Sequence, residues 1–168
     1  MEALTLSKTN SITQTMEEIV LNAHNKTENP QNHTTEHLLN QTMIRLFNCG
    51  RAVSAHIEAK KSKCDYSLPQ EPTAEEISNI ENTMNTVIAH GLPVYSEFME
   101  KGKAKEIYNL SKLPDDASET LKIVHIGDYD ACPCIGIHVE NTKEIGSFKI
   151  LSSSYENGIW RVRWKTIR

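Results

Sequence analysis

Two pairs of residues that bind metals in proteins lie far apart in the sequence. His33 and His37 are four positions apart in a segment with helical spacing, so their imidazoles project from the same side of the expected helix. Cys134 and His138 have the same separation in a segment without regular periodicity. Imidazole and thiolate groups are the usual ligands of four-coordinate zinc. The two pairs together predict a Zn2+ site formed by His33, His37, Cys134 and His138.

The chain has other cysteines and histidines whose thiol and imidazole groups could also bind a metal. Cys132 is an alternative thiolate ligand, but the spacing to His138 favours Cys134. Cys49 and Cys64 are expected to be small apolar side chains in the core. Three further histidines have no partner spacing that links them to the metal site, and we expect them to be structural or exposed: His56, His90 and His125.

Two polar residues stand between the paired histidines. Thr34 stands at the start of the expected helix, where Thr is a common cap, and the family resemblance described below implies a second role for its hydroxyl, a hydrogen bond with a polar group of a substrate. Glu36 has the chemistry of a general base, but the helix dipole equally favours a carboxylate in the first turn. Both are candidate catalytic residues, and the helix-start alternative stays open for each.

Helices are predicted where apolar residues recur with a period near 3.6. Residues 12–24 have this spacing, and residues 33–47 have it more clearly, with a left-handed cap expected at Gly50. Thr73 and Glu76 form a capping-box pattern that opens a helix over residues 74–90. A shorter, lysine-rich helix is predicted over residues 97–110.

Strands are predicted where polar and apolar residues alternate. Residues 52–60 and 62–68 have the pattern of a hairpin that is half-buried on one face, and residues 92–96 and 121–126 have that of single strands. Two longer runs, residues 147–155 and 159–167, flank Asn157 and Gly158, a strong hairpin signal. Residues 129–146 are predicted to be irregular. Helices that interrupt hairpins indicate the α+β class, with a mixed, mainly antiparallel sheet and packed helices.

Composition restricts the class of protein. The chain has 168 residues, of which 38% are apolar, and it contains no apolar run long enough to cross a bilayer. Its amino end lacks the pattern of a secretory signal, so a cytoplasmic location is expected. The net charge of −4 means that an RNA partner would have to bind a local basic patch. We expect an N-terminal helical extension over residues 1–30 and one domain over residues 31–168.

One such patch is predicted on the last strand. Arg161, Arg163 and Lys165 alternate with apolar residues, so one face of the strand is basic. Such a face can follow the phosphates of an RNA, and these three residues are the candidate RNA-binding residues. A charged outer face is also the ordinary condition of an exposed strand.

The segments around both metal-ligand pairs resemble a known family. HTTEHLLNQTM, which begins at His33, looks like the H-[T/S]-x-x-H-L-L stretch of the editing domain shared by alanyl- and threonyl-tRNA synthetases and by free-standing alanyl-tRNA editing proteins. CPCIGIHVENTKEIGSFKI, which begins at Cys132, resembles that family's C-x-G-T-H-V-x-x-T-x-E-I-G-x-F-K-I. The similarity covers roughly residues 33–164.

This resemblance implies a fold, an activity, a cofactor and a partner. The fold is that of the synthetase editing domain. The activity is hydrolysis of the ester that joins a wrongly attached amino acid to the terminal ribose of tRNA, which serves translation fidelity. The cofactor is zinc, held at the positions matched by His33, His37, Cys134 and His138. If all four residues bind at once, the ion must expand its coordination or position the substrate's amino group, and the sequence leaves this open.

Two departures from the family pattern lead to alternatives. Apolar Ile135 and Ile137 stand where the family has Gly and Thr, which predicts a different aminoacyl group or a loss of activity. The alternative function is therefore a non-catalytic zinc-binding or RNA-binding remnant of a synthetase editing domain.

A second alternative comes from residues 33–37, which spell the H-x-x-E-H motif of some zinc peptidases, but those enzymes are much longer chains.

Overall fold

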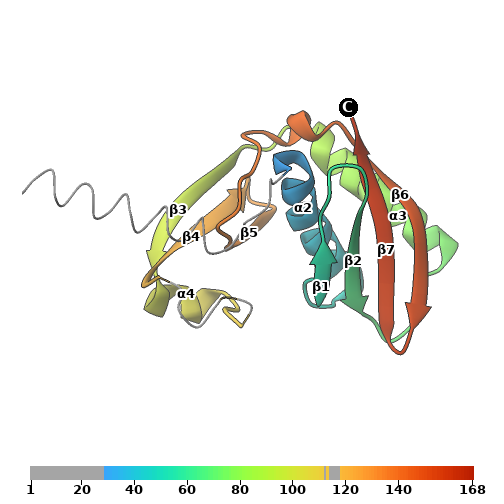
Figure 1. Cartoon of the computed structure of the whole chain (residues 1–168), viewed down its shortest axis with the longest axis horizontal. Coiled ribbons are helices and arrows are strands. Elements are labelled where there is room, and N and C mark those ends of the chain that lie inside the picture. Colours follow the sequence, from blue (N-terminus) through green and yellow to red (C-terminus); the bar gives the residue numbers. More distant parts are fainter. Residues whose placement is uncertain (1–28, 112, 114–117) are drawn as a thin grey trace, which may run out of the picture. The chain divides into compact units, whose positions relative to one another are not determined.

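The computed structural model describes residues 29–111, 113 and 118–168 (Figure 1). The helix predicted over residues 12–24 lies outside these ranges, as does the predicted N-terminal extension up to residue 28. The described residues fall into two compact units. The larger comprises Asn29–Tyr95, His125–Ala131 and Ile137–Arg168, and the smaller comprises Ser96–Val124 and Cys132–Gly136.

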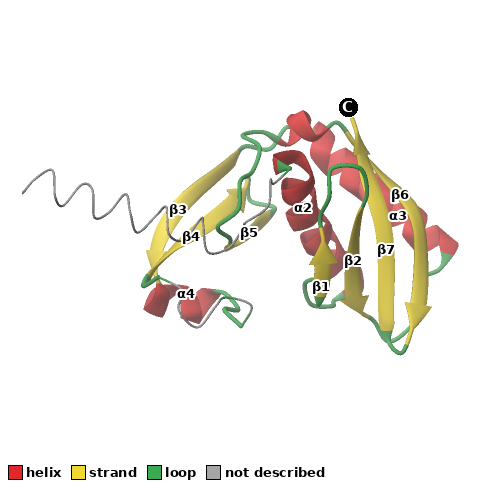
Figure 2. Ribbon diagram, viewed as in Figure 1, coloured by secondary structure: helices red, strands yellow, loops and turns green. Residues whose placement is uncertain are grey.

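The larger unit consists of a four-stranded sheet and two helices, α2 (Pro30–Phe47) and α3 (Ala74–Ala89) (Figures 1 and 2). The strand order is β1-β2-β7-β6, and neighbouring strands pair in antiparallel fashion. The strand bounds are Ser54–His56 for β1, Ser62–Ser67 for β2, Ser147–Glu156 for β6 and Ile159–Ile167 for β7. Helices packed with a mainly antiparallel sheet confirm the predicted α+β class.

The side chains of strand β7 alternate between the core and the outer face of this sheet. Trp160, Val162 and Trp164 are fully buried and pack with apolar residues of both helices. The residues between them, which include Arg161 and Arg163, are only partly buried and point to the opposite face. The predicted alternation of basic and apolar residues is therefore confirmed.

Helix α3 has the predicted beginning and end. The hydroxyl of Thr73 accepts a hydrogen bond from the Glu76 N–H at 3.1 Å, and the Glu76 carboxylate accepts one from the Thr73 N–H at 2.9 Å. This reciprocal pair is the capping box that the sequence indicates. Gly91 follows the helix with φ at 68°, a conformation that glycine adopts without a steric penalty.

Helix α2 begins earlier and ends differently than predicted. Its first residue is Pro30 rather than His33, because the Asn29 side chain caps the helix by accepting a hydrogen bond from the Asn32 N–H at 2.9 Å. The left-handed cap is Asn48, with φ at 52°, rather than Gly50. Asn tolerates this conformation better than most residues, which explains why the helix ends before the glycine.

The hairpin of β6 and β7 turns at the predicted residues. Asn157 and Gly158 have φ of 53° and 77°, and two consecutive residues with positive φ match the twist of antiparallel strands. The first hairpin, β1 and β2, is also present, but all three residues of β1 are exposed. The expectation of a half-buried first strand was wrong, because β1 is a short edge strand that pairs only with β2.

A second sheet has the strand order β3-β4-β5, formed by Val94–Glu100, Thr120–Ile126 and Asp130–Pro133. The helix predicted over residues 97–110 is only Lys101–Ile107, labelled α4. Its first part belongs to β3 instead, and the Lys101 N–H donates a hydrogen bond to the Glu119 carbonyl at 2.7 Å. Residues 129–146 are not wholly irregular, because they contain β5 and a 3-10 helix, η1 (Thr142–Ile145).

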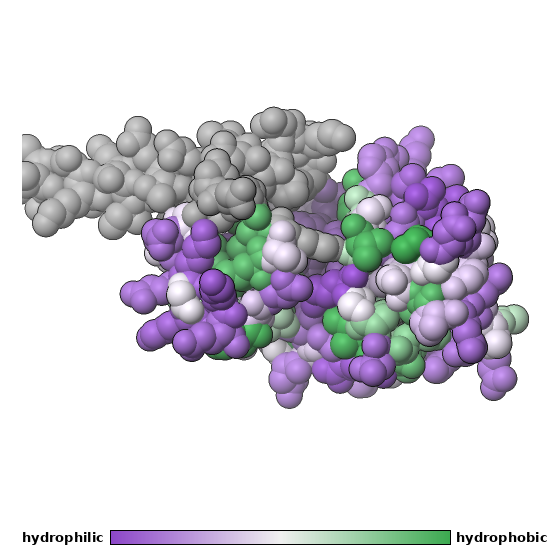
Figure 3. Space-filling view, turned by 90° about the horizontal axis from the view of Figure 1, so that it is seen from below, coloured by the Kyte–Doolittle hydropathy of each residue, from purple (hydrophilic) through white to green (hydrophobic). Residues whose placement is uncertain are grey.

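On the face shown in Figure 3, the apolar side chains of the described residues form several separate groups, with hydrophilic side chains between them. Among the described residues, no helix is both long and apolar enough to cross a membrane.

Candidate metal centre

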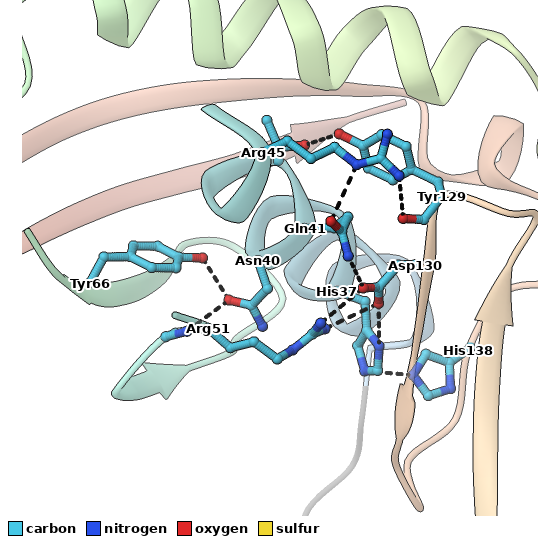
Figure 4. A network of polar contacts seen from close by, with 11 residues as sticks. His37, Asn40, Gln41, Arg45, Arg51, Tyr66, Tyr129, Asp130 and His138 are labelled. Carbon is cyan, nitrogen blue, oxygen red and sulfur yellow. Dashed lines mark hydrogen bonds and ion pairs between the residues drawn. The ribbon is translucent and has the colours of Figure 1, made fainter. Parts of the chain in front are cut away.

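Three of the four predicted metal ligands meet within the larger unit. His33 and His37 lie in the first two turns of α2, and His138 lies in the loop between β5 and η1. Nε2 of His37 and Nε2 of His138 are 3.2 Å apart (Figure 4). The ring of His33 stacks on that of His138, with centroids 4.4 Å apart. Each of these histidines offers a ring nitrogen within 4.8 Å of those of the other two.

These distances suit a shared ion. Two nitrogens bound at 2.0 to 2.1 Å to a tetrahedral zinc are about 3.3 to 3.4 Å apart. The separation of 3.2 Å between the His37 and His138 nitrogens is close to that value. The separation of these two nitrogens therefore fits a shared zinc ion, and His33 offers a third ring nitrogen within 4.8 Å of both.

Thr34 fastens the His138 loop to helix α2. Its side chain is fully buried, and its hydroxyl accepts a hydrogen bond from the Val139 N–H at 3.1 Å. The same hydroxyl donates to the Pro30 carbonyl at 2.7 Å. These bonds give Thr34 a structural role beside His138. Its predicted contact with a substrate, and the predicted role of Glu36 as a general base, stay predictions.

Cys134 belongs to the smaller unit. Its N–H donates a hydrogen bond to the Lys122 carbonyl of β4 at 3.0 Å. The chain from Cys134 to His138 allows their Cα atoms to be at most about 14 Å apart. All four cysteines of the chain lie among the described residues and form no disulfide. Cys134 and, as the alternative, Cys132 therefore stay the predicted thiolate ligands.

A carboxylate that no sequence pattern indicated lies behind His37. The side chain of Asp130 is fully buried, and its Oδ2 is 3.6 Å from Nδ1 of His37. Arg51 binds this carboxylate with two hydrogen bonds, of 2.9 and 3.1 Å, and Gln41 donates a third at 2.9 Å. Figure 4 shows the three side chains converging on Asp130 from helix α2 and from the segment after it.

The electrostatics of Asp130 reflect two opposed effects. Burial disfavours its charged form, but the nearby ring of His37 and the hydrogen bonds from Arg51 favour that form, as does the positive charge of Arg51. The second group of effects prevails and holds the pKa of the Asp130 carboxyl well below its ordinary value. Asp130 is therefore an anion at neutral pH. Among the residues around Asp130, Gln41 could have been linked to the site from the sequence. It follows His37 by four positions, and residues four apart share a helix face.

Further contacts hold the turn before Asp130 on helix α2. Arg45 donates a hydrogen bond to the Tyr129 carbonyl at 2.9 Å, and its guanidinium lies 4.1 Å from the centre of the Tyr129 ring. The hydroxyls of Tyr129 and Thr42 are 2.6 Å apart. These contacts fix the position of Asp130 relative to the helix that carries His37.

The predicted basic residues of β7 have two different environments. Arg161 binds Asp65 through two hydrogen bonds, of 2.8 and 2.9 Å, so its charge is compensated. This contact, more than the opposing burial, lowers the pKa of the Asp65 carboxyl. Arg163 and Lys165 lie instead opposite two further cations, since Arg163 pairs in register with Lys63 and Lys165 with Lys149.

The remaining cysteines and histidines mostly agree with expectation. Cys64 is fully buried in the core, and burial raises the pKa of its thiol to about 12, whereas Cys49 is only partly buried. His56 is exposed and its Nε2 is 2.6 Å from the Glu58 carboxylate. His125 stacks on Tyr95, with ring centroids 4.9 Å apart.

Several known proteins are similar to this chain in sequence. Residues 121–163, which include Cys134 and His138, match the sequence profile of the threonyl and alanyl tRNA synthetase second additional domain. An alanine-tRNA ligase of Methanococcus vannielii is 30% identical over 155 residues, which covers 87% of this chain and 17% of that protein.

Bacterial relatives give the same result. An alanine-tRNA ligase of Ligilactobacillus salivarius is 32% identical over 132 residues, covering 78% of this chain and 15% of that protein. An alanine-tRNA ligase of Leptospira biflexa is 33% identical over 126 residues, which covers 71% of this chain and 13% of that protein. The chain thus spans about a sixth of the length of these ligases or less. The chain is thus related to the threonyl and alanyl tRNA synthetase second additional domain, the family whose profile residues 121–163 match.

Proposed function

We propose that this protein is a cytoplasmic hydrolase that removes wrongly attached amino acids from tRNA. The observation that carries the proposal is the meeting of His33, His37 and His138 at one place, in a chain related to alanyl-tRNA synthetases. In the proposed reaction, water adds to the carbonyl carbon of the aminoacyl ester. The bond to the terminal ribose oxygen then breaks, that oxygen takes up a proton, and free amino acid and tRNA are released.

We further propose that the three histidines hold a zinc ion and that Cys134 supplies the fourth ligand. The sequence supports Cys134 because it lies four residues before His138, and Cys132 is the alternative. A zinc ion bound there would make a water molecule more acidic and polarise the ester carbonyl. The short distance between the His37 and His138 nitrogens supports the site independently of the family relation.

The protein's own groups have separate proposed roles. Thr34 holds the His138 loop against α2 through its bond to the Val139 N–H, and a substrate contact by its hydroxyl is a further role to be tested. Glu36, which is partly buried beside His37, is the proposed general base that takes the proton from the attacking water. Neither role requires a separate protein nucleophile.

For the tRNA, we propose contacts to phosphates on the outer face of the four-stranded sheet. Arg163 and Lys165 are the main candidates, since register places Lys63 and Lys149 beside them and four cations are thereby gathered. Arg161 is the third candidate, but its bond to Asp65 reduces the charge that it can offer to a phosphate.

A non-catalytic zinc-binding or RNA-binding protein is the second candidate function. It is favoured by Ile137, the residue before His138. The Ile137 side chain is 55% exposed. An apolar side chain at a position where the family has a hydroxyl cannot donate a hydrogen bond to a substrate. Zinc binding without turnover of any aminoacyl-tRNA is the mark of this alternative.

The two candidates differ in a deacylation assay. We expect wild-type protein to release the amino acid from at least one of mischarged seryl-, glycyl- and alanyl-tRNA, and His33→Ala to abolish release. His56→Ala is the matched control, because His56 is an exposed histidine bonded to Glu58 rather than to the cluster. Zinc-loaded wild-type protein that deacylates none of the three substrates would favour the non-catalytic candidate.

A further inference from the structure

The buried carboxylate of Asp130 lies on the side of the His37 ring opposite the atom that faces His138. Its Oδ2 is 3.6 Å from Nδ1 of His37, while Nε2 of the same ring is 3.2 Å from His138 (Figure 4). We propose that Asp130, held by Arg51 and Gln41, is a positioning residue that keeps the proton of His37 on Nδ1 and so presents Nε2 to the metal. This inference rests on the proposed metal centre.

The chemistry of imidazole supports this role. A neutral ring carries one proton, and the nitrogen without it is the one that can bind a metal. A carboxylate facing Nδ1 attracts the proton to that atom, which leaves the lone pair on Nε2. The 3.6 Å separation is longer than a hydrogen bond, and a small shift of the ring toward Asp130 would close it.

The contacts of Asp130 argue against its being a metal ligand itself. Its Oδ1 accepts hydrogen bonds from Gln41 and from one nitrogen of Arg51, and its Oδ2 accepts one from the other nitrogen of Arg51. The side chain has no exposed surface. Both oxygens thus already accept hydrogen bonds, and Oδ2 also lies 3.6 Å from Nδ1 of His37.

The position of the carboxylate is fixed relative to His37. Gln41 lies one turn after His37 on the same helix, so its bond connects Asp130 directly to α2. Tyr129, the residue before Asp130, is bound by Arg45 and lies 2.6 Å from the Thr42 hydroxyl, and both partners belong to α2. A carboxylate held in this way can orient the ring without moving when a metal binds.

The same contacts would also stabilise the fold, so the test needs a matched control. Asp65 is a second nearly buried carboxylate that an arginine binds with two hydrogen bonds, and it does not contact the three histidines. Asp65→Asn therefore removes a comparable ion pair without touching His37. Asp130→Asn removes the charge beside His37 with little change in volume.

Two readouts separate positioning from stability. The first is zinc affinity, measured by competition with a chelator: we expect Asp130→Asn to bind zinc about 10- to 100-fold more weakly than wild type and Asp65→Asn to stay within about twofold. The second is the 15N NMR spectrum of the His37 ring in zinc-free protein at a pH where the ring is neutral. We expect the Nδ1–H form in wild type and a mixture of both forms in Asp130→Asn.

Several results would overturn the inference. The inference would be wrong if Asp130→Asn bound zinc as tightly as wild type. It would also be wrong if Asp130→Asn and Asp65→Asn lost zinc affinity equally. A His37 ring protonated on Nε2 in the wild type would overturn it as well. If Asp130→Asn does not fold, Gln41→Met removes a single bond to the carboxylate, and an unchanged His37 spectrum and zinc affinity in that variant would count against the inference. Wild-type protein that binds no zinc would instead contradict the metal centre, while the spectrum would still decide the role of Asp130.

Discussion

The hydroxyl of Thr34 and the backbone N–H of Val139, 105 positions apart in the sequence, are joined by a buried hydrogen bond of 3.1 Å. This bond connects the helix that carries His33 and His37 to the residue after His138. Because the loop is attached at the residue after His138, the bond holds His138 close to His33 and His37.

Replacement of Thr34 tests this relationship. Thr34→Val leaves the Val139 N–H buried without an acceptor, and we expect the free energy of unfolding to fall by about 1 to 3 kcal/mol. Zinc affinity should fall as well, since the His138 loop is released. Denaturant unfolding and chelator competition measure the two effects. Thr34→Ser keeps the hydroxyl and is the control, and equal losses in both variants would contradict the role of the bond.

The ion pair of Asp65 and Arg161 predicts a pH dependence. The pKa of Asp65 is lowered in the folded protein from its ordinary value of 3.8, so the folded state favours the carboxylate. The contribution of Asp65 to the free energy of unfolding is complete above that ordinary value and is lost as the pH falls through the lower folded value. Urea unfolding of wild type and Asp65→Asn should therefore differ most near neutral pH and converge in acid. A difference that grows as the pH falls would refute this assignment.

The two environments on β7 predict different effects on RNA binding. Arg163→Gln and Lys165→Gln should each weaken tRNA binding and reduce the slope of log affinity against log salt by about 1. Arg161→Gln should have a smaller effect, because Asp65 already compensates its charge. Filter binding at several salt concentrations measures these slopes, and Lys105→Gln on α4 serves as a charge control. Equal slopes for wild type, Arg163→Gln and Lys165→Gln would show that the tRNA binds elsewhere.

The turn between β6 and β7 predicts a glycine requirement. Gly158 has φ at 77°, which disfavours any side chain, so Gly158→Ala should lower the free energy of unfolding by about 1 kcal/mol. Gly102, in helix α4, has open space where the Cβ atom of an alanine would lie, and Gly102→Ala should leave stability equal or slightly higher. Thermal unfolding of the two variants compares them. A larger loss for Gly102→Ala than for Gly158→Ala is the contrary result.

Much of the fold follows from local sequence patterns. The capping box of Thr73 and Glu76, the alternation along β7 and the turn at Asn157 and Gly158 depend on residues close in the chain, and all three are present as predicted. The spacing of His33 and His37 likewise places both on one helix face. Sequence patterns were less reliable at residues 97–100, where pairing of β3 with a distant strand outweighs a helical pattern.

The support behind the metal site could not be predicted in the same way. Asp130 meets His37 and Arg51 because Tyr129 and Asp130 contact α2, and their sequence positions share no spacing rule. An isolated aspartate in a segment without periodicity gives no signal of burial. The buried contact of Thr34 with Val139 was hidden for the same reason, since a threonine near a helix start is usually interpreted as a cap.

A zinc ion held by the three histidines and Cys134 is central to the proposed function. The most direct test is the metal content of protein purified without added zinc, for wild type and for His33→Ala and Cys134→Ala. We expect about one zinc per wild-type chain and loss of that zinc in both variants. Wild-type protein that is folded and free of metal, or variants that keep a full complement of zinc, would contradict the proposed site.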